Sequence, residues 1–272
     1  IVLLRSAGFD SPQARYSFVA ANPFLTFRSF GSRCEVTSFD SQLSAPDSQL
    51  QYGNPWHLLD ALMARYELLD EIDLPFPLGG CFGYWGYDLK NFTEPKLPRR
   101  AVNDLELPDC HVGFHASLVV FDHRLGKTCI VATGLGADGA RTEARARAQV
   151  EFWKSALQQD LPQRHRGTEG GDQNSSAQRL GESVAKVSSN FSREEFVSKV
   201  TRVQQYIRAG DIYQVNLSQR LATSCAFSGW ELFTRLLAVS PAPFAAFLDC
   251  GDFQIASSSP EQFLRMSGSH IA

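Results

Sequence analysis

The stretch from residue 192 to residue 261 alternates between helical and strand-like periodicity, and this alternation constrains the fold more than any other feature. Ser192 and Glu195 form a capping-box pattern, and apolar residues then recur at helical spacing as far as Gly210, where a glycine typically ends a helix. From residue 212 to residue 220 the period changes to two, which is typical of a β-strand. This alternation predicts a mixed α and β fold.

The predicted strand over residues 212–220 has two different faces. Tyr213, Val215 and Leu217 fall on one face. The other face carries only polar side chains, namely Gln214, Asn216, Ser218 and Arg220. Taken alone, such a face is typical of a strand exposed to solvent.

The rest of the chain predicts three segments. Residues 1–157 carry helix and strand patterns that predict an α+β unit, including a helix that Asn54 caps and Pro55 opens. Residues 158–190 hold no aromatic residue and are rich in polar residues, which predicts a linker. Residues 191–272 then predict the beginning of a second domain, with a hairpin over residues 244–256.

The glycine-rich run over residues 79–88 invites interpretation as a phosphate-binding loop. It lacks the Gly-Lys-Ser/Thr sequence of such loops, and its glycines alternate with aromatic residues. An aromatic strand packed closely against neighbouring backbone is therefore the better prediction. Residues 112–122 and 127–133 predict two further strands joined as a hairpin.

Composition excludes several classes of partner. The formal net charge of −3 gives no reason to expect a nucleic-acid or membrane partner, and the apolar runs are too short to span a bilayer. The 6 cysteines are scattered without metal-site spacing, so we expect free thiols in a reducing cytoplasm.

Three motifs carry a resemblance to a known family. They are GDIYQVNLSQR (210–220), SPAPFAAF (240–247) and SSSPEQF (257–263), and residues 3–6, 15–17 and 79–88 agree with them. In this order the motifs resemble the chorismate-utilising enzymes over nearly the whole chain. Asn216 and Leu217 replace the Val-Pro pair that anthranilate synthase component I usually has, which favours a resemblance to component I of aminodeoxychorismate synthase.

The resemblance implies a fold and a reaction. The fold is α+β, with antiparallel sheets covered by helices. The reaction is amination of chorismate at C4, with ammonia from a glutamine amidotransferase partner, which gives 4-amino-4-deoxychorismate for 4-aminobenzoate and folate synthesis. The family uses Mg²⁺ and a lysine in a Pro-Ile-Lys-Gly-Thr motif. We expect both the lysine and the metal ligands beyond residue 272, so the 272 residues alone are expected to be inactive.

Two candidate catalytic residues follow from the resemblance. Glu261 matches the glutamate of the Ser-Pro-Glu motif, which would act as a general acid or base near the leaving hydroxyl. The alternative is a structural glutamate at a helix start after Pro260. Gln214 stands where the water-using relatives have a lysine base, and an amide cannot deprotonate water. The resemblance therefore implies that ammonia is the nucleophile.

A second site is implied by the same resemblance. Ser6, Tyr213, Pro243 and Phe244 match positions around a tryptophan pocket of the family. Tyr213 and Phe244 could equally be core aromatics. Arg5 replaces a glutamate of the anthranilate synthase pattern, which argues against feedback control by tryptophan.

Two rival functions stay open at this point. Anthranilate synthase component I, of tryptophan biosynthesis, aminates chorismate at C2 and expels pyruvate. A non-catalytic module would bind an aromatic amino acid or the amidotransferase and do no chemistry.

Overall fold

The computed structural model describes residues 1–6, 15–39, 45–68, 74–100, 103–158, 186–267 and 270–271. The chain divides into two units, the first made of residues 1–163 and 229–272 and the second of residues 164–228. Each unit is described by itself.

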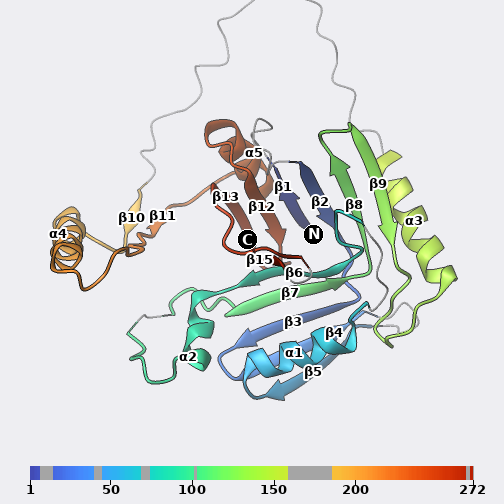
Figure 1. Cartoon of the computed structure of the whole chain (residues 1–272), viewed down its shortest axis with the longest axis horizontal. Helices are drawn as coiled ribbons and strands as arrows, with labels where there is room; N and C mark the ends of the chain where they lie inside the picture. Colours follow the sequence, from blue (N-terminus) through green and yellow to red (C-terminus); the bar gives the residue numbers. More distant parts are fainter. Residues whose placement is uncertain are drawn as a thin grey trace, which may run out of the picture. The chain divides into compact units, whose positions relative to one another are not determined.

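The first unit contains an antiparallel sheet built from strands far apart in the sequence (Figure 1). In spatial order the 6 strands are β13 (Gln254–Ser259), β12 (Phe244–Asp249), β1 (Val2–Arg5), β2 (Tyr16–Ala20), β8 (Ser117–Asp122) and β9 (Lys127–Ala132). Strand β1 lies between β2 and β12, so the beginning of the chain pairs with a segment more than two hundred residues away.

A second antiparallel sheet completes the framework of this unit. In spatial order its 5 strands are β5 (Asp47–Tyr52), β4 (Arg33–Ser38), β3 (Leu25–Phe30), β7 (Cys110–His115) and β6 (Gly80–Trp85). The hairpin that joins β3 to β4 turns at Gly31, whose φ of 58° lies in the left-handed region that glycine adopts readily.

Helices and short elements complete the first unit. The helices are α1 (Pro55–Arg65), η1 (Tyr87–Leu89), α2 (Lys90–Thr93), α3 (Glu143–Gln158) and α5 (Gly229–Val239), and the short strands are β14 (Met266–Ser267) and β15 (His270–Ile271). The side chain of Asn54 accepts a hydrogen bond from the backbone N–H of Trp56 at 3.0 Å, and Pro55 opens α1, as predicted.

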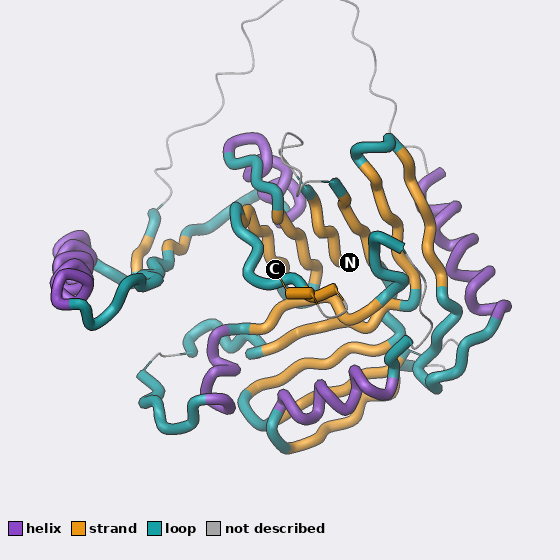
Figure 2. The backbone as a smooth tube through the Cα atoms, in the orientation of Figure 1, coloured by secondary structure: helices purple, strands orange, loops and turns teal. Residues whose placement is uncertain are grey.

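Helices α1, α3 and α5 lie against the two sheets (Figure 2). On β8, Leu118 and Val120 pack in one cluster with Phe82 of the five-stranded sheet. Val119 points the opposite way and packs against Trp153 of α3. Because both faces of β8 are covered, these three consecutive apolar residues are all buried, at 0 to 1% exposed.

Helices α5 and α1 cover the remaining outer surfaces. Phe233 of α5 is fully buried against Ala245 and Phe247 of β12. On the other sheet, Leu59 of α1 joins the cluster that contains Phe27 of β3. The α+β class with antiparallel sheets covered by helices is therefore confirmed.

The domain boundaries differ from the sequence prediction. We expected residues 191–272 to begin a second domain after a linker over 158–190. Instead, residues 229–272 belong to the first unit, because β12 and β13 complete its six-stranded sheet and α5 covers them. Most of the expected linker, residues 159–185, lies outside the described residues.

Two strand predictions in the first unit also need correction. Residues 112–122 are not one strand: β7 ends at His115 and β8 begins at Ser117, and the two strands belong to different sheets. Continuous apolar character did not reveal this break, because both strands are buried. The polar composition of residues 40–53 is typical of a loop, but residues 47–52 form β5, an edge strand whose residues are all exposed and therefore carry no apolar pattern.

The second unit holds α4 (Arg193–Ala209) and a two-residue pairing of β10 (Ser188–Ser189) with β11 (Leu221–Ala222). The predicted capping box is present: Ser192 Oγ accepts from the N–H of Glu195 at 3.1 Å, and the Glu195 carboxylate accepts from the N–H of Ser192 at 2.8 Å. Gly210 ends α4 with a φ of 79°, also as predicted.

The strand predicted over residues 212–220 is wrong for this structure. Among the described residues the segment pairs with no strand before β11, and most of its side chains are exposed, including Tyr213 at 93%. Alternation of side chains favours a strand only where another strand pairs with the backbone and a core covers one face. Within the described part of the second unit, neither condition is met at residues 212–220.

The aromatic run over residues 79–88 does form a strand in close contact with its neighbour. Strand β6 pairs with β7, and Gly83 lies opposite Val112. A Cβ atom added to Gly83 would lie 2.7 Å from the Cα of Val112 and closer still to the carbonyl oxygen of His111. The interpretation as closely packed backbone is therefore confirmed.

We predict that Gly83→Ala lowers the free energy of unfolding by ~3 kcal/mol, because β6 must move away from β7 to admit the methyl group. Gly31→Ala is the matched control, since its added Cβ would meet no atom within 4 Å and only the left-handed backbone resists the change. That control should cost about 1 kcal/mol. Chemical denaturation of both variants measures the difference, and equal costs would contradict the close approach of the two strands.

Candidate functional site

A cavity of about 360 Å³ opens where the end of β1 meets the beginning of β12. The antiparallel register pairs Arg5 with Ala245, so the residues one step further, Ser6 and Phe244, also become neighbours. Three of the four residues predicted for an aromatic pocket line this cavity, namely Ser6, Pro243 and Phe244. The structure therefore brings together positions that lie far apart in the sequence.

Ser6 is held in place by two hydrogen bonds. Its backbone N–H donates to Ser17 Oγ at 3.1 Å, and its own hydroxyl donates to the carbonyl oxygen of Tyr16 at 2.8 Å. The residue is 6% exposed. Ser6 thus fixes the end of β1 against β2 and shapes the wall of the cavity.

The remaining lining combines flat apolar groups with cationic and amide side chains. The other residues are Leu4, Arg5, Tyr16, Phe18, Pro75, Pro77, Ala245, Gln262 and Arg265. The ring of Tyr16 packs edge-on against Phe76, with 5.9 Å between ring centroids. Aromatic rings and prolines offer flat surfaces on which a planar ligand can stack.

Charge is distributed unevenly around this cavity. Arg5 and Arg265 make no hydrogen bond or ion pair with the described residues. The neighbouring Arg15 differs, because its guanidinium is held by Asp122 at 2.8 Å, which lowers the pKa of that carboxyl. No carboxylate belongs to the described lining, so the cavity carries an excess of positive charge.

Tyr213, the fourth predicted pocket residue, lies in the second unit together with Gln214. Both are exposed. They precede β11 in a segment without helix or strand, and no core among the described residues holds their side chains. The assignment of Tyr213 to the pocket and of Gln214 to catalysis stays a prediction.

Glu261 follows β13 in a segment without helix. The alternative that it opens a helix after Pro260 does not describe this structure. Its side chain is exposed and makes no hydrogen bond or ion pair with the described residues, while its backbone oxygen accepts from Ser259 Oγ at 3.1 Å. The next residue, Gln262, lines the cavity. The carboxylate is thus free to act on a substrate, and its catalytic role stays a prediction.

Among the described residues, no three His, Cys, Asp or Glu side chains gather closely enough to hold a metal ion. In the same part of the chain, no helix combines the length and apolar character needed to cross a membrane.

Comparison with known proteins identifies the class. Residues 6–272 match the family described as chorismate binding enzyme, so the chain belongs to that family. It is 31% identical to anthranilate synthase component 1 of Acetivibrio thermocellus, over 97% of this chain and 51% of that protein. It is 30% identical to aminodeoxychorismate synthase component 1 of Escherichia coli K12, over 99% of this chain and 52% of that protein.

A solved structure agrees with the fold. Anthranilate synthase component I from Streptococcus pneumoniae TIGR4 superposes with a TM-score of 0.68 at 23% identity, covering 96% of this chain and 54% of that one. The chain spans about half the length of the curated relatives it matches.

Sequence reasoning missed several residues of the cavity. Tyr16 stands in the short motif that supported the resemblance, and Gln262 follows Glu261 directly, so both stood beside motifs already recognised. Arg265 carried no such signal, because a single arginine in a polar segment is usually a solvated side chain.

A second cavity, of about 440 Å³, lies between α1 and the edge of β6 and β7. Cys81 and His115 line it. Burial raises the pKa of the Cys81 thiol to about 12 and lowers the pKa of His115 to about 4. Both groups are therefore neutral near pH 7, which makes Cys81 a poor nucleophile.

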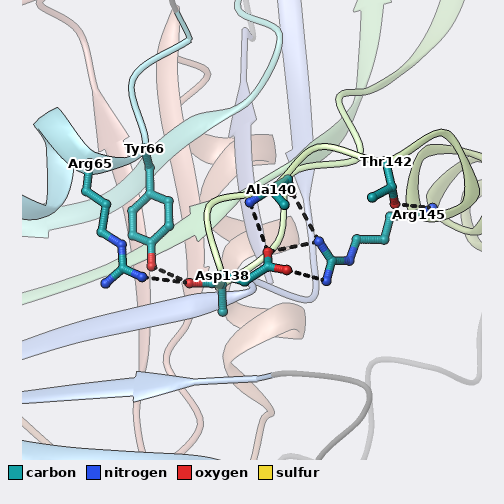
Figure 3. A network of polar contacts seen from close by, with 7 residues as sticks. Arg65, Tyr66, Asp138, Ala140, Thr142 and Arg145 are labelled. Atoms are coloured by element: carbon teal, nitrogen blue, oxygen red, sulfur yellow. Dashed lines mark hydrogen bonds and ion pairs between the residues drawn. The ribbon is translucent and has the colours of Figure 1, made fainter.

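A polar network beside this second cavity joins α1 to the loop before α3 (Figure 3). Tyr66 donates its hydroxyl to the carbonyl oxygen of Ala137 at 2.8 Å, and Arg65 reaches the same oxygen at 3.5 Å. Asp138 accepts from both terminal nitrogens of Arg145 at 2.9 Å, which lowers the pKa of its carboxyl. These contacts are all satisfied within the protein, so we interpret the network as structural.

We predict that Tyr66→Phe lowers the free energy of unfolding by about 1 kcal/mol, because the carbonyl of Ala137 loses its strongest donor. Tyr52→Phe is the control, since Tyr52 is 71% exposed. It should change the free energy of unfolding by no more than a few tenths of a kcal/mol. Urea denaturation measures both, and a neutral Tyr66→Phe would show that the hydrogen bond does not join α1 to this loop.

Proposed function

We propose that the protein to which this chain belongs aminates chorismate at C4 and forms 4-amino-4-deoxychorismate for 4-aminobenzoate and folate synthesis. Membership in the chorismate-binding family supports the choice of substrate. The observation that carries the choice of reaction is Gln214, followed by Asn216 and Leu217. A glutamine amidotransferase partner would supply the ammonia, in the cytoplasm.

Gln214 supports ammonia over water as the nucleophile. Water must lose a proton to attack an activated ring carbon, and a carboxamide side chain has no useful basicity. Neutral ammonia already carries a lone pair and needs no base before it attacks. An amide at this position therefore favours amination over hydration.

Glu261 supplies the proton chemistry in this proposal. As ammonia adds to the ring, the C4 hydroxyl must leave as water and requires a proton. A free carboxyl group within reach of the substrate can donate that proton and later accept one from the added nitrogen. The exposed, unpaired state of Glu261 is compatible with this role.

Mg²⁺ belongs to the proposal as the cofactor of the whole protein. A magnesium site needs several oxygen ligands, chiefly carboxylates. The described residues do not offer such a group, so they do not fit the ion and the proposed chemistry of this chain does not pass through it.

The cavity between β1 and β12 is proposed to hold an aromatic ligand, tryptophan being the compound suggested by the resemblance. Its volume of about 360 Å³ and its aromatic and proline walls support a small planar compound. Tyr213 stays part of this proposal.

A second candidate function is amination at C2, the anthranilate synthase reaction. The specific observation in its favour is the 31% identity to anthranilate synthase component 1 of Acetivibrio thermocellus. The identity to aminodeoxychorismate synthase component 1 of Escherichia coli is nearly the same, at 30%. Overall similarity therefore does not separate the two reactions.

We predict that the full-length protein, given chorismate, Mg²⁺ and ammonium, consumes chorismate without releasing pyruvate. Lactate dehydrogenase and NADH report pyruvate, and fluorescence reports anthranilate. Pyruvate that appears only after an aminodeoxychorismate lyase is added supports C4 amination. Pyruvate with anthranilate fluorescence and no lyase would favour the C2 reaction, and chorismate that is never consumed would favour a non-catalytic module.

We predict that Glu261→Gln in the full-length protein lowers kcat by roughly 10²-fold or more, the scale of one lost acid–base group. Glu94→Gln is the matched control: it makes the same change on another exposed side chain and should leave kcat unaltered. The melting temperature of both variants should match that of the wild type. A near-normal kcat for Glu261→Gln would remove Glu261 from the mechanism.

A further inference from the structure

Strand β5 forms an open edge of the five-stranded sheet (Figure 1). It pairs with β4 on one side, and among the described residues no strand pairs with it on the other. Every residue of β5 is exposed, which is true of no other described strand of five or six residues. Such an edge offers a row of unpaired backbone N–H and C=O groups to another strand.

Strand β5 lacks the usual protection against pairing with another chain. Native proteins often protect an edge strand with lysine, proline or a bulge. The strand sequence DSQLQY contains no lysine, arginine or proline, and its register with β4 is continuous, without a bulge. Its single charged residue, Asp47, stands at the end of the strand and accepts a hydrogen bond from Gln49 Nε2 at 3.2 Å. The edge is therefore free to pair.

The hydrogen bonds to β4 determine which backbone groups of β5 point outward. The N–H of Gly53, directly after β5, donates to the carbonyl oxygen of Ser32 at 2.9 Å. In an antiparallel pair, hydrogen-bonded positions alternate with positions whose N–H and C=O point away from the partner. Because the register is continuous, the odd-numbered residues of β5 bond to β4. The even-numbered residues, Ser48, Leu50 and Tyr52, present their backbone groups at the open edge.

We infer that this edge pairs with the same edge of a second copy of the chain, antiparallel, about a two-fold axis at Leu50. The outward backbone groups can bond to each other only if even-numbered residues lie opposite even-numbered residues. The register that uses all three of them places Leu50 opposite the partner's Leu50, and Ser48 opposite the partner's Tyr52. About six backbone hydrogen bonds then join the two sheets into one continuous sheet.

The side chains of β5 match one another in this register. Leu50 meets the partner's Leu50, and the ring of Tyr52 lies beside the partner's Ser48. Leu50 and Tyr52 are 52% and 71% exposed in the single chain, so the pairing removes apolar surface from water. On the other face, Gln49 meets the partner's Gln51, and two amides can each donate and accept a hydrogen bond.

The charges near the edge also favour a second copy as the occupant. Asp47 lies opposite the partner's Gly53, so no two like charges face each other across the axis. Behind the edge, Arg33 and Glu35 of β4 form an ion pair at 3.3 Å and so offset each other. A strand of another protein would gain the backbone hydrogen bonds, but this sequence already provides its own match of apolar, amide and charged side chains.

Sedimentation equilibrium of the full-length protein measures this association. We expect a dimer with a Kd of roughly 10–100 μM, because about six residues on each side form a small interface. Leu50→Lys places two like charges side by side at the axis and should weaken the dimer by roughly 10-fold or more. Leu125→Lys is the matched control, since Leu125 is 57% exposed in the turn between β8 and β9. It should leave the Kd unchanged.

Disulfide trapping tests the register. The Cα atoms of the two Leu50 residues should lie roughly 5.5 Å apart, as in other hydrogen-bonded antiparallel pairs, and this separation suits a disulfide. The two Gln49 residues would be diagonal neighbours more than about 7 Å apart, which is too far for a disulfide without backbone movement. In a Cys225→Ser background, which removes an exposed thiol, diamide should therefore cross-link Leu50→Cys and not Gln49→Cys.

Each outcome supports or overturns the inference. A full-length protein that stays monomeric at concentrations well above the expected Kd overturns it and leaves the edge to a different partner. A dimer that Leu50→Lys does not weaken forms through another surface and overturns it as well. Equal cross-linking at both positions, or none at Leu50→Cys, does the same. Circular dichroism checks the fold of each variant, and if Leu50→Lys does not fold, the cross-linking pair decides. The inference does not rest on the proposed reaction.

Discussion

The pairing of β1 with β12 is the interaction on which the rest of the first unit depends. It joins Val2 to Leu248 and Arg5 to Ala245 across most of the chain. Without it, β12 and β13 would have no sheet to extend, and the buried face of α5 would lose the surface against which Phe233 packs. Backbone pairing and burial of apolar side chains therefore stabilise the same region, where β1 pairs with β12.

The same pairing creates the cavity. Along a strand, side chains pack against those of the neighbouring strands. At the end of a strand the chain turns away, and the last side chains lose those neighbours. Ser6, immediately after β1, and Pro243, immediately before β12, lie at such an end. Arg5 and Arg265 reach this opening without an acidic partner from the described residues, so the charge of the cavity follows from the place where two distant segments meet.

The cavity beside α1 and the cavity between β1 and β12 differ in chemistry although both have aromatic walls. The cavity beside α1 is lined by neutral Cys81 and His115, whose pKa values burial shifts away from ionisation near pH 7, and by the exposed carboxylates Asp60 and Glu67. The cavity between β1 and β12 is lined by two guanidiniums. The two cavities therefore offer a ligand different electrostatic surroundings.

The sequence by itself determined what depends on neighbours along the chain. The capping box of Ser192 and Glu195, the Asn54 cap and the close packing at Gly83 were predictable because each is set by local hydrogen bonding or by the absence of a side chain. The motifs also determined the family, since they stand in a fixed order. The positions of Ser6, Pro243 and Phe244 around one pocket came from that resemblance and not from periodicity.

Only the tertiary structure decided which segments share a core. It placed β12 and β13 with the first unit, separated β7 from β8, and gave residues 212–220 no strand partner within the described part of the chain. It also brought Arg265 to the cavity that Arg5 lines. The reason is that strand pairing and charge complementarity act between residues distant in sequence. Local sequence patterns do not indicate which distant segment will be the partner.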